Sequence, residues 1–310
     1  MFDKLAILGL GLIGSSISHA TRRGNLAKSI VGSARSAATR ETAMRIGLVD
    51  SVFEHPADAV RDADLIVLCV PVGSCGAVAR AMASGLKSGA IITDVGSVKG
   101  SVVEDVKPHL PDNVHFIPGH PIAGTEHSGP ESGFAELFDD RWCILTPPPG
   151  TDSEQLHRLT AFWRGLGSNV DVMAPDHHDL VLAITSHLPH LIAYNIVNTA
   201  EHLERVADAE VIKYSAGGFR DFTRIAASDP TMWRDVFLNN KDAVLEMLGR
   251  FTEDLTSLQR AIRYGDGDTL FQLFSDARRI RHGIIEAGQD TDEPDFGRHA
   301  TAGPTAADET

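Results

Sequence analysis

The feature that most constrains the fold is a glycine-rich turn near the N-terminus. Residues Gly9-Leu10-Gly11-Leu12-Ile13-Gly14 read G-x-G-x-x-G, after the apolar run Leu5–Leu10 and at the start of a helical pattern, Leu12–Arg23. Such glycines allow a tight turn, a close backbone approach to a pyrophosphate, and close packing of a helix on a strand. The motif therefore predicts the first β-α unit of a dinucleotide-binding fold; the alternative is a glycine-rich turn without a ligand.

The rest of the first half alternates apolar runs with amphipathic segments. The runs that read as strands are Ser29–Ser33, Leu65–Val70, Ala90–Asp94, His115–Pro118, Trp142–Thr146 and Asn169–Val172. The segments that read as helices include Ala37–Ile46, Gly76–Ala83 and Ser153–Leu166. This rhythm predicts an α/β, Rossmann-like, doubly wound sheet domain over residues 1–175.

From Pro175 onward the pattern becomes all helical, which predicts an all-α domain over residues 176–285. Its most regular segment predicts one helix from Pro230 to Tyr264, with Asp229 as N-cap. Apolar residues step by four and three along it, at Val244, Leu248, Phe251, Leu255, Leu258 and Ile262. This stripe either packs in an intrachain core or pairs with a second subunit. Residues 286–310 hold seven acidic residues against one arginine and predict a flexible acidic tail.

Composition excludes several classes of function. The formal net charge of −14 argues against a nucleic-acid partner, which needs a basic surface. The longest apolar run, Leu65 to Val72, is too short to span a membrane, and the N-terminus lacks a basic signal region. Three cysteines without metal or redox spacing indicate reduced thiols. We therefore expect a cytoplasmic protein.

The end of the second strand predicts which cofactor is bound. NAD-binding folds usually carry a carboxylate there for the ribose 2′-hydroxyl, and the segment Val31–Ser36 has none. Ser33, Arg35 and Arg40 could instead contact a 2′-phosphate, so NADP is predicted over NAD; alternatively, Arg35 is a solvated loop residue. The other expected cofactor contacts are Leu12, Ile13, Val70, Pro71 and Ser97.

Two residues that follow strands are candidates for the chemistry. Ser97, in Asp94-Val95-Gly96-Ser97-Val98-Lys99-Gly100, follows a strand, where open α/β sheets bind ligands; it could equally cap the next helix. His120 lies between Gly119 and Pro121 and suits proton abstraction near neutral pH.

Two motifs of the helical half are also informative. His187 and His190 in Ser186-His187-Leu188-Pro189-His190 have a spacing that could bind a metal, but no nearby Glu or Cys completes a set, so no metal is predicted. Arg224, after the turn Gly217-Gly218, suits bidentate binding of a carboxylate from a partly buried position; the alternative is a salt bridge to Asp221.

Taken together, these segments resemble the prephenate/arogenate (cyclohexadienyl) dehydrogenase family of tyrosine biosynthesis. The matching segments, in order, are GLGLIGSS from Gly9, DVGSVKG from Asp94, GHPIAGTEHSG from Gly119, SHLPH from Ser186 and GGFRDFTRIAASDPTMWRD from Gly217. The resemblance implies a C-terminal dimerisation domain and a homodimer. It also implies that His120 is catalytic, that Ser97 contacts the same substrate hydroxyl, and that Arg224 binds a substrate carboxylate. The other implied substrate-pocket positions are His178, His187, His190, Gly217 and Trp233.

The implied reaction is oxidative decarboxylation of prephenate or L-arogenate with NAD(P)+. The sequence leaves open which substrate is used, and a further hypothesis is that tyrosine inhibits at the active site. One alternative is a β-hydroxyacid dehydrogenase, but those enzymes use a lysine early in the helical domain, and here none occurs between Asp176 and Ile212. The other is a non-catalytic NADP-binding sensor, which would not need His120, Ser97 and Arg224 together.

Overall fold

The computed structural model describes residues 1–125, 127–207 and 212–286. The predicted acidic tail, apart from Glu286, lies outside the described residues. Contacts divide the chain into two compact units, Met1–Met247 and one that begins at Leu248. This division falls well after the predicted boundary at 175/176, which rested on the change from mixed to all-helical sequence.

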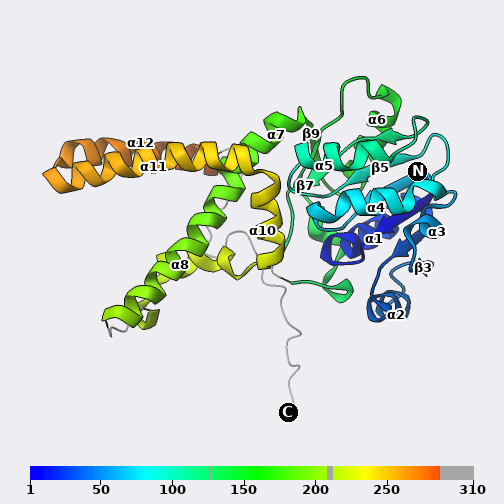
Figure 1. Ribbon diagram of the computed structural model, residues 1–310, viewed down its shortest axis with the longest axis horizontal. Helices are drawn as coiled ribbons and strands as arrows, with labels where there is room; N and C mark the ends of the chain where they lie inside the picture. The colour runs from blue at the N-terminus through cyan, green and yellow to red at the C-terminus, as the bar shows by residue number, and fades with distance from the viewer. Residues whose placement is uncertain (126, 208–211, 287–310) are drawn as a thin grey trace, which may run out of the picture. The chain divides into compact units, whose positions relative to one another are not determined.

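The first unit is built on a six-stranded parallel sheet of order β3-β2-β1-β4-β5-β6 (Figure 1). Its strands are β1 (Phe2–Leu8), β2 (Ala27–Ser33), β3 (Ser51–Phe53), β4 (Leu65–Leu68), β5 (Ile91–Asp94) and β6 (His115–Phe116). The strand order reverses between β1 and β4, which confirms the Rossmann-like prediction and places the ligand site at the carboxyl ends of these strands. The short β3 was not predicted, because three half-buried residues give no apolar run.

Alternation along the strands divides the core between the two faces of the sheet. On one face, residues such as Leu5 and Leu65 pack with the helices α1 (Leu12–Gly24), α2 (Ala37–Arg45) and α6 (Ser153–Gly165). On the other face, residues such as Ala6 and Ile66 pack with α3 (Pro56–Val60), α4 (Cys75–Met82), α5 (Gly100–Val106) and α10 (Pro230–Asn239). Both faces are therefore covered, as a parallel sheet requires.

A second, three-stranded sheet positions the candidate histidine. It comprises β7 (Gly119–Pro121), β8 (Trp142–Leu145) and β9 (Asn169–Val172), with β7 antiparallel to β8 and β9 parallel to it. The sequence pattern had suggested one parallel sheet, with a strand over His115–Pro118. The chain instead leaves β6 at Phe116 and re-pairs from Gly119, so that His120 lies opposite Ile144.

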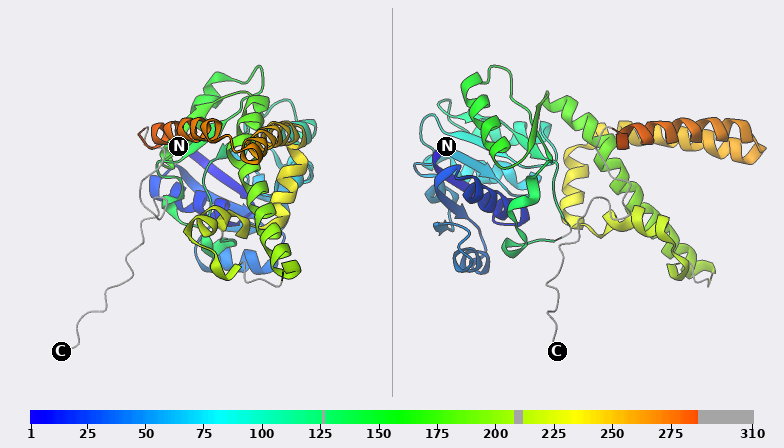
Figure 2. Two further views of the ribbon diagram at one scale, coloured as in Figure 1. Left: turned by 90° about the vertical axis from the view of Figure 1, so that its left-hand side faces the viewer. Right: turned by 180° about the vertical axis from the view of Figure 1, so that it is seen from behind.

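The helical half begins with one long run that changes its helical type within the serine-histidine motif. It comprises α7 (Pro175–Leu182), a π-helical turn (Ala183–His187) and α8 (Leu188–Ala207), and Figure 2 shows it as a continuous rod. Pro189 has no N–H to donate to the preceding turn, so the α-helical hydrogen-bond pattern is interrupted beside the π turn. By length and composition alone, the segment Pro175–Arg205 is apolar enough to cross a membrane, although most of it is not buried in this chain.

The predicted helix from Pro230 to Tyr264 is wrong, because it is two helices. Asp229 caps α10 as predicted, accepting a hydrogen bond from Met232 N at 2.8 Å. Asn240 then leaves helical geometry and its side chain is buried, and α11 (Lys241–Tyr264) begins after it. The remaining helices are α9 (Gly217–Thr223) and α12 (Gly267–Glu286). The apolar stripe gives no sign of this break, because it begins at Val244, after Asn240.

The second unit contains most of α11 together with α12, which lie side by side (Figures 1 and 2). Several large apolar side chains of these helices remain exposed. They include Leu255, Ile262, Phe271, Phe274 and Ile280. The stripe on α11 is therefore only partly covered within this chain.

Candidate active site

The glycine motif forms a turn that fits a dinucleotide phosphate. Gly9 has φ +107°, and a Cβ there would lie 2.1 Å from the Cys69 carbonyl oxygen. A Cβ on Gly14 would lie 2.1 Å from the Gly9 carbonyl oxygen, so strand and helix pack too closely for a side chain. Gly11, which precedes α1 and caps it without a side-chain bond, faces open space. The free N–H groups of this helix terminus are thus open to a phosphate, and Val70 lies beside Gly9.

Arg35 and Arg40, the two arginines predicted to contact a 2′-phosphate, both follow β2 but differ in their contacts. Arg40 donates to the carbonyls of Ala34 and Arg35 at 2.8 and 2.7 Å and pairs with Glu54 at 3.0 Å. Its guanidinium is therefore engaged in holding this loop. Arg35 is exposed, and no ion pair involves it among the residues that the structure describes. Of the two, Arg35 is the one available to a ligand.

The candidate catalytic histidine is joined to a second histidine and a carboxylate. His120 is 8% exposed, and its Nδ1 lies 2.9 Å from Nε2 of the fully buried His178. His178 Nδ1 in turn lies 2.8 Å from Asp179 Oδ1. The two carboxylate oxygens of Asp179 also accept the backbone N–H groups of Lys99 and Gly100, at 2.7 and 2.8 Å. His178, predicted as a substrate contact, thus contacts His120 directly.

The hydrogen-bonded series His120–His178–Asp179 determines which ring nitrogens carry protons. Because the Asp179 carboxylate accepts hydrogen bonds, the hydrogen between it and His178 is on His178 Nδ1, and His178 Nε2 is an acceptor. His120 must therefore donate through Nδ1, which leaves its Nε2 unprotonated. Burial, followed by the nearby His178 and Lys99, lowers the pKa of His120 well below 6.5. His120 is consequently a neutral base at neutral pH, with Nε2 free to accept a proton.

A buried ion pair holds the strand ends around His120. The fully buried Lys99 pairs through Nζ with Asp94 and also donates to the Gly119 carbonyl at 2.7 Å. Asp94 accepts the backbone N–H groups of Gly96 and Gly119, at 2.8 and 3.2 Å. The end of β5, the start of β7 and the first turn of α5 are thereby fixed to one another.

Three other predicted pocket residues form an aromatic cluster. His190 stacks on Trp233 with ring centroids 3.6 Å apart, and His187 packs edge-on to Trp233 at 6.0 Å. Burial lowers the pKa of His187 to about 4. His187 Nε2 and Trp233 Nε1 are both buried without a hydrogen-bond partner among the described residues. The backbone of Ser97 lies close enough to His187 to raise its pKa, against the larger effect of burial. The indole N–H of Trp233 is therefore the unpartnered donor of this cluster among the described residues, and it suits an acceptor oxygen of a ligand.

The remaining predicted residues, Ser97, Arg224 and Gly217, differ in how close they lie to these side chains. Ser97 does not cap α5, whose N-cap is Lys99; its backbone lies against His187. Arg224 is close enough to His190 to lower the pKa of that histidine, although burial has the larger effect. Arg224 is exposed rather than partly buried, and in the described part of the chain it forms no salt bridge with Asp221. Its guanidinium is therefore available to an anion. Gly217 begins α9, and in the described part of the chain a Cβ added there would meet only Asp221.

Asp179 and Lys99 belong to the site but were not predicted from the sequence. The sequence held a signal for Asp179, because a carboxylate directly after a histidine, here His178, can orient a neighbouring ring. Lys99 belonged to a noted motif, but a buried lysine cannot be distinguished from a solvated one by sequence.

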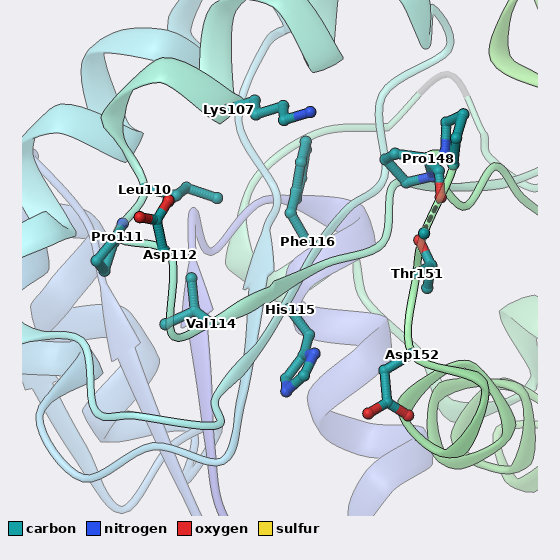
Figure 3. Close-up of a pocket in the computed structure, with 12 residues that line it drawn as sticks. Lys107, Leu110, Pro111, Asp112, Val114, His115, Phe116, Pro148, Thr151 and Asp152 are labelled. Atoms are coloured by element: carbon teal, nitrogen blue, oxygen red, sulfur yellow. Dashed lines mark hydrogen bonds between the residues drawn. The ribbon is translucent and has the colours of Figure 1, made fainter.

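A separate cavity lies elsewhere in the first unit. It has a volume of about 440 Å³ and is lined by residues of the β6 region and the proline-rich loop, including Lys107, His115, Phe116, Pro148 and Thr151 (Figure 3). None of the predicted site residues lines it. Its charged residues, Lys107 and Asp152 among them, do not converge on one point in Figure 3. It is therefore not the candidate active site.

The fold and the site define a class: a nicotinamide-dinucleotide-dependent dehydrogenase with an α/β nucleotide-binding domain and a helical second domain. Two family models match the chain. The model for the prephenate dehydrogenase nucleotide-binding domain covers residues 17–172, and that for the dimerization domain covers residues 174–276. The chain belongs to the prephenate dehydrogenase family.

Individual relatives agree with this assignment. The chain is 43% identical over 281 residues to a cyclohexadienyl dehydrogenase of Zymomonas mobilis, covering 91% of this chain and 96% of that one. It is 34% identical to the prephenate dehydrogenase of Bacillus subtilis, covering 92% and 76%. Among solved structures, prephenate dehydrogenase from Aquifex aeolicus with hydroxyphenyl propionate and NAD+ superposes with TM-score 0.86 at 34% identity, covering 92% and 99%. Synechocystis arogenate dehydrogenase gives 0.77 at 28%, covering 91% and 99%.

Proposed function

We propose that this protein oxidatively decarboxylates a cyclohexadienyl substrate, prephenate or L-arogenate, with NAD(P)+. The observation that carries the proposal is the series of contacts from His120 through His178 to Asp179, from which we infer that Nε2 of His120 is unprotonated. Relatives named as cyclohexadienyl, prephenate and arogenate dehydrogenases support the substrate class. The products are 4-hydroxyphenylpyruvate or tyrosine, together with CO2.

Each residue of the site has a separate role in the proposed reaction. A nicotinamide dinucleotide held at the Gly9–Gly14 turn would supply the hydride acceptor for the ring carbon that carries the hydroxyl group. His120 Nε2 takes the hydroxyl proton, and Ser97 aligns the same hydroxyl group. The new carbonyl is conjugated to the carbon that bears the carboxylate, so CO2 leaves and the ring becomes aromatic. Arg224 binds a carboxylate of the substrate and orients it.

The test is a steady-state assay that crosses both substrates with both cofactors. Nicotinamide reduction that depends on prephenate or arogenate would support the proposal. Reduction with neither substrate would refute it, and turnover of a small β-hydroxy acid would favour the alternative dehydrogenase. Adding tyrosine at several substrate concentrations tests whether it inhibits competitively.

We further propose that NADP is preferred over NAD. The support is the exposed Arg35 beside a β2 terminus that lacks a carboxylate. Replacing Arg35→Ala should raise KM for NADP about tenfold or more and leave KM for NAD nearly unchanged, since only NADP carries the 2′-phosphate. The control is Arg45→Ala, an exposed arginine that pairs with Glu131. Equal effects of Arg35→Ala on both cofactors would contradict the preference.

Two expectations about the whole protein also belong here. We propose a homodimer, supported by the family's dimerization domain and by the exposed apolar side chains on α11 and α12. We propose a cytoplasmic location, supported by three cysteines that form no disulfide and include two buried thiols.

A further inference from the structure

Tyr194 lies on the face of α8 that packs against the segment carrying Arg224 and Trp233. Its hydroxyl group donates to the Ser228 carbonyl at 2.7 Å. Its ring packs against the buried cluster that includes Trp233. His190, about one helical turn earlier on the same face of α8, stacks on the Trp233 ring. Two side chains of one helix face therefore contact the segment between Arg224 and Trp233.

Ser228 connects the Tyr194 hydroxyl group to the turn that bears Arg224. The 3₁₀ turn Arg224–Ala227 ends directly before Ser228. The hydroxyl group and the backbone N–H of Ser228 both donate to the Ile225 carbonyl, at 2.8 and 3.3 Å. Because Ile225 follows Arg224 in the chain, the hydrogen bond from Tyr194 holds the backbone of the turn from which the arginine side chain projects.

The turn Arg224–Ala227 depends on such a hydrogen bond because apolar packing holds it only weakly. None of its four residues is buried. A segment with little buried surface moves easily unless hydrogen bonds to a rigid element restrain it. Burial, followed by the nearby Asp229, raises the pKa of Tyr194, so the phenol stays protonated and remains a donor at neutral pH. The bond to the Ser228 carbonyl therefore ties the turn to the long helix α8.

We propose that Tyr194 is a positioning residue that holds Arg224 in the orientation in which it binds the substrate carboxylate. This rests on the proposed function, in which Arg224 binds that carboxylate. Arginine pairs with a carboxylate through two parallel N–H···O bonds, so its affinity depends on orientation. A turn that is fixed before the substrate arrives also reduces the entropy lost on binding. The Tyr194 hydroxyl group therefore contributes to substrate affinity through Arg224.

The first variant is Tyr194→Phe, which removes the hydroxyl group and keeps the ring that packs beside Trp233. We expect KM for the cyclohexadienyl substrate to rise about 3–10-fold, the range that corresponds to the loss of one hydrogen bond. Values of kcat, and of KM for the cofactor, should stay within about twofold of wild type, because Arg224 is assigned to substrate binding alone. An unchanged KM for the substrate would overturn the proposal.

The matched control is Tyr264→Phe, which removes the same hydroxyl group at a distant place. Tyr264 is the last residue of α11 and its side chain is exposed. We expect this variant to keep the wild-type kcat and KM values. A rise in KM as large as that of Tyr194→Phe would contradict the proposal.

A double-mutant cycle tests whether Tyr194 acts through Arg224. In the Arg224→Ala protein, Tyr194→Phe should raise KM no further, because the side chain that Tyr194 positions is already absent. A merely structural role of Tyr194 predicts the same rise in KM in the wild-type and the Arg224→Ala proteins. That result would overturn the proposal.

Backbone hydrogen exchange tests the positioning without turnover. In Tyr194→Phe, the amides of the turn Arg224–Ala227 and of Ser228 should exchange faster than in wild type, while those of β1 should be unchanged. Equal exchange in the two proteins would overturn the proposal even if no activity is measured. A wild-type protein that reduces a nicotinamide with neither substrate would instead refute the proposed function, and the exchange rates would still decide whether Tyr194 holds the turn.

Discussion

At the scale of single residues, the proposed proton transfer requires His120 to have an unprotonated Nε2. Two neighbours set this state, His178 by accepting from Nδ1 and Asp179 by accepting from His178. The sequence could predict His120, because a histidine between glycine and proline after a strand has few structural uses. It could not predict the relay, because His178 and Asp179 are more than fifty positions away and only the fold brings them close.

Replacing His120→Asn should lower kcat by about 10²–10⁴-fold, the usual contribution of a positioned general base, with KM little changed. The measurement is steady-state kinetics with saturating cofactor. His115→Asn is the control, because His115 lies in β6 and lines the separate cavity. Unchanged kcat in His120→Asn would reject the assignment of the base.

The pH dependence of kcat/KM should show the lowered pKa of His120. The neutral form is the base and exists above its pKa. Because burial, His178 and Lys99 hold that pKa well below 6.5, activity should persist as the pH falls through 6.5 and decline only below it. The measurement is a pH–rate profile between pH 5 and 9. An acidic limb centred at 6.5 or above would contradict the neutral, buried base.

At the scale of elements, the site lies where β5, β7, α5 and α7 meet. Lys99 joins three of them through Asp94, the Gly119 carbonyl and the Asp179 carboxylate. The helices and parallel strands could be predicted from apolar periodicity and glycine placement. The second sheet could not, because pairing partners and direction leave little trace in a short apolar run. The break at Asn240 left no trace in the apolar stripe, because the stripe begins beyond it, at Val244.

Replacing Lys99→Met should lower the free energy of unfolding by about 3–5 kcal/mol, since it leaves the buried Asp94 without its cation. Urea unfolding at pH 7.5 measures this. Lys87→Met is the control, because its ion pair with Asp64 is partly exposed and should contribute only about 0–1 kcal/mol. Similar losses in the two variants would show that burial does not distinguish these pairs.

At the scale of the whole molecule, the helical half exposes more apolar surface than one chain can cover. Exposed side chains occur on α8, α11 and α12, for example Ile196, Leu255 and Phe274. This surface explains why Pro175–Arg205 is apolar enough to resemble a membrane span. We attribute it to contact with a second copy, in keeping with the matched dimerization domain. Composition alone could not decide between these environments.

Replacing Phe274→Arg should convert the dimer to a monomer of 33.3 kDa, because a symmetric interface would receive two buried charges. Light scattering coupled to size-exclusion chromatography gives the mass. Gln272→Arg is the control on the same helix, where Gln272 donates to the nearby Asp276 at 3.1 Å. A Phe274→Arg protein that remains dimeric would place the interface away from this part of α12.

The central claim is that His120 takes the hydroxyl proton while a cyclohexadienyl ring is oxidised and decarboxylated. Its most direct test is the stoichiometry of products formed from prephenate or arogenate by the wild-type protein. The account predicts one CO2 released for each nicotinamide reduced, with both rates falling together in His120→Asn. Nicotinamide reduction without CO2, or rates that do not depend on His120, would contradict it.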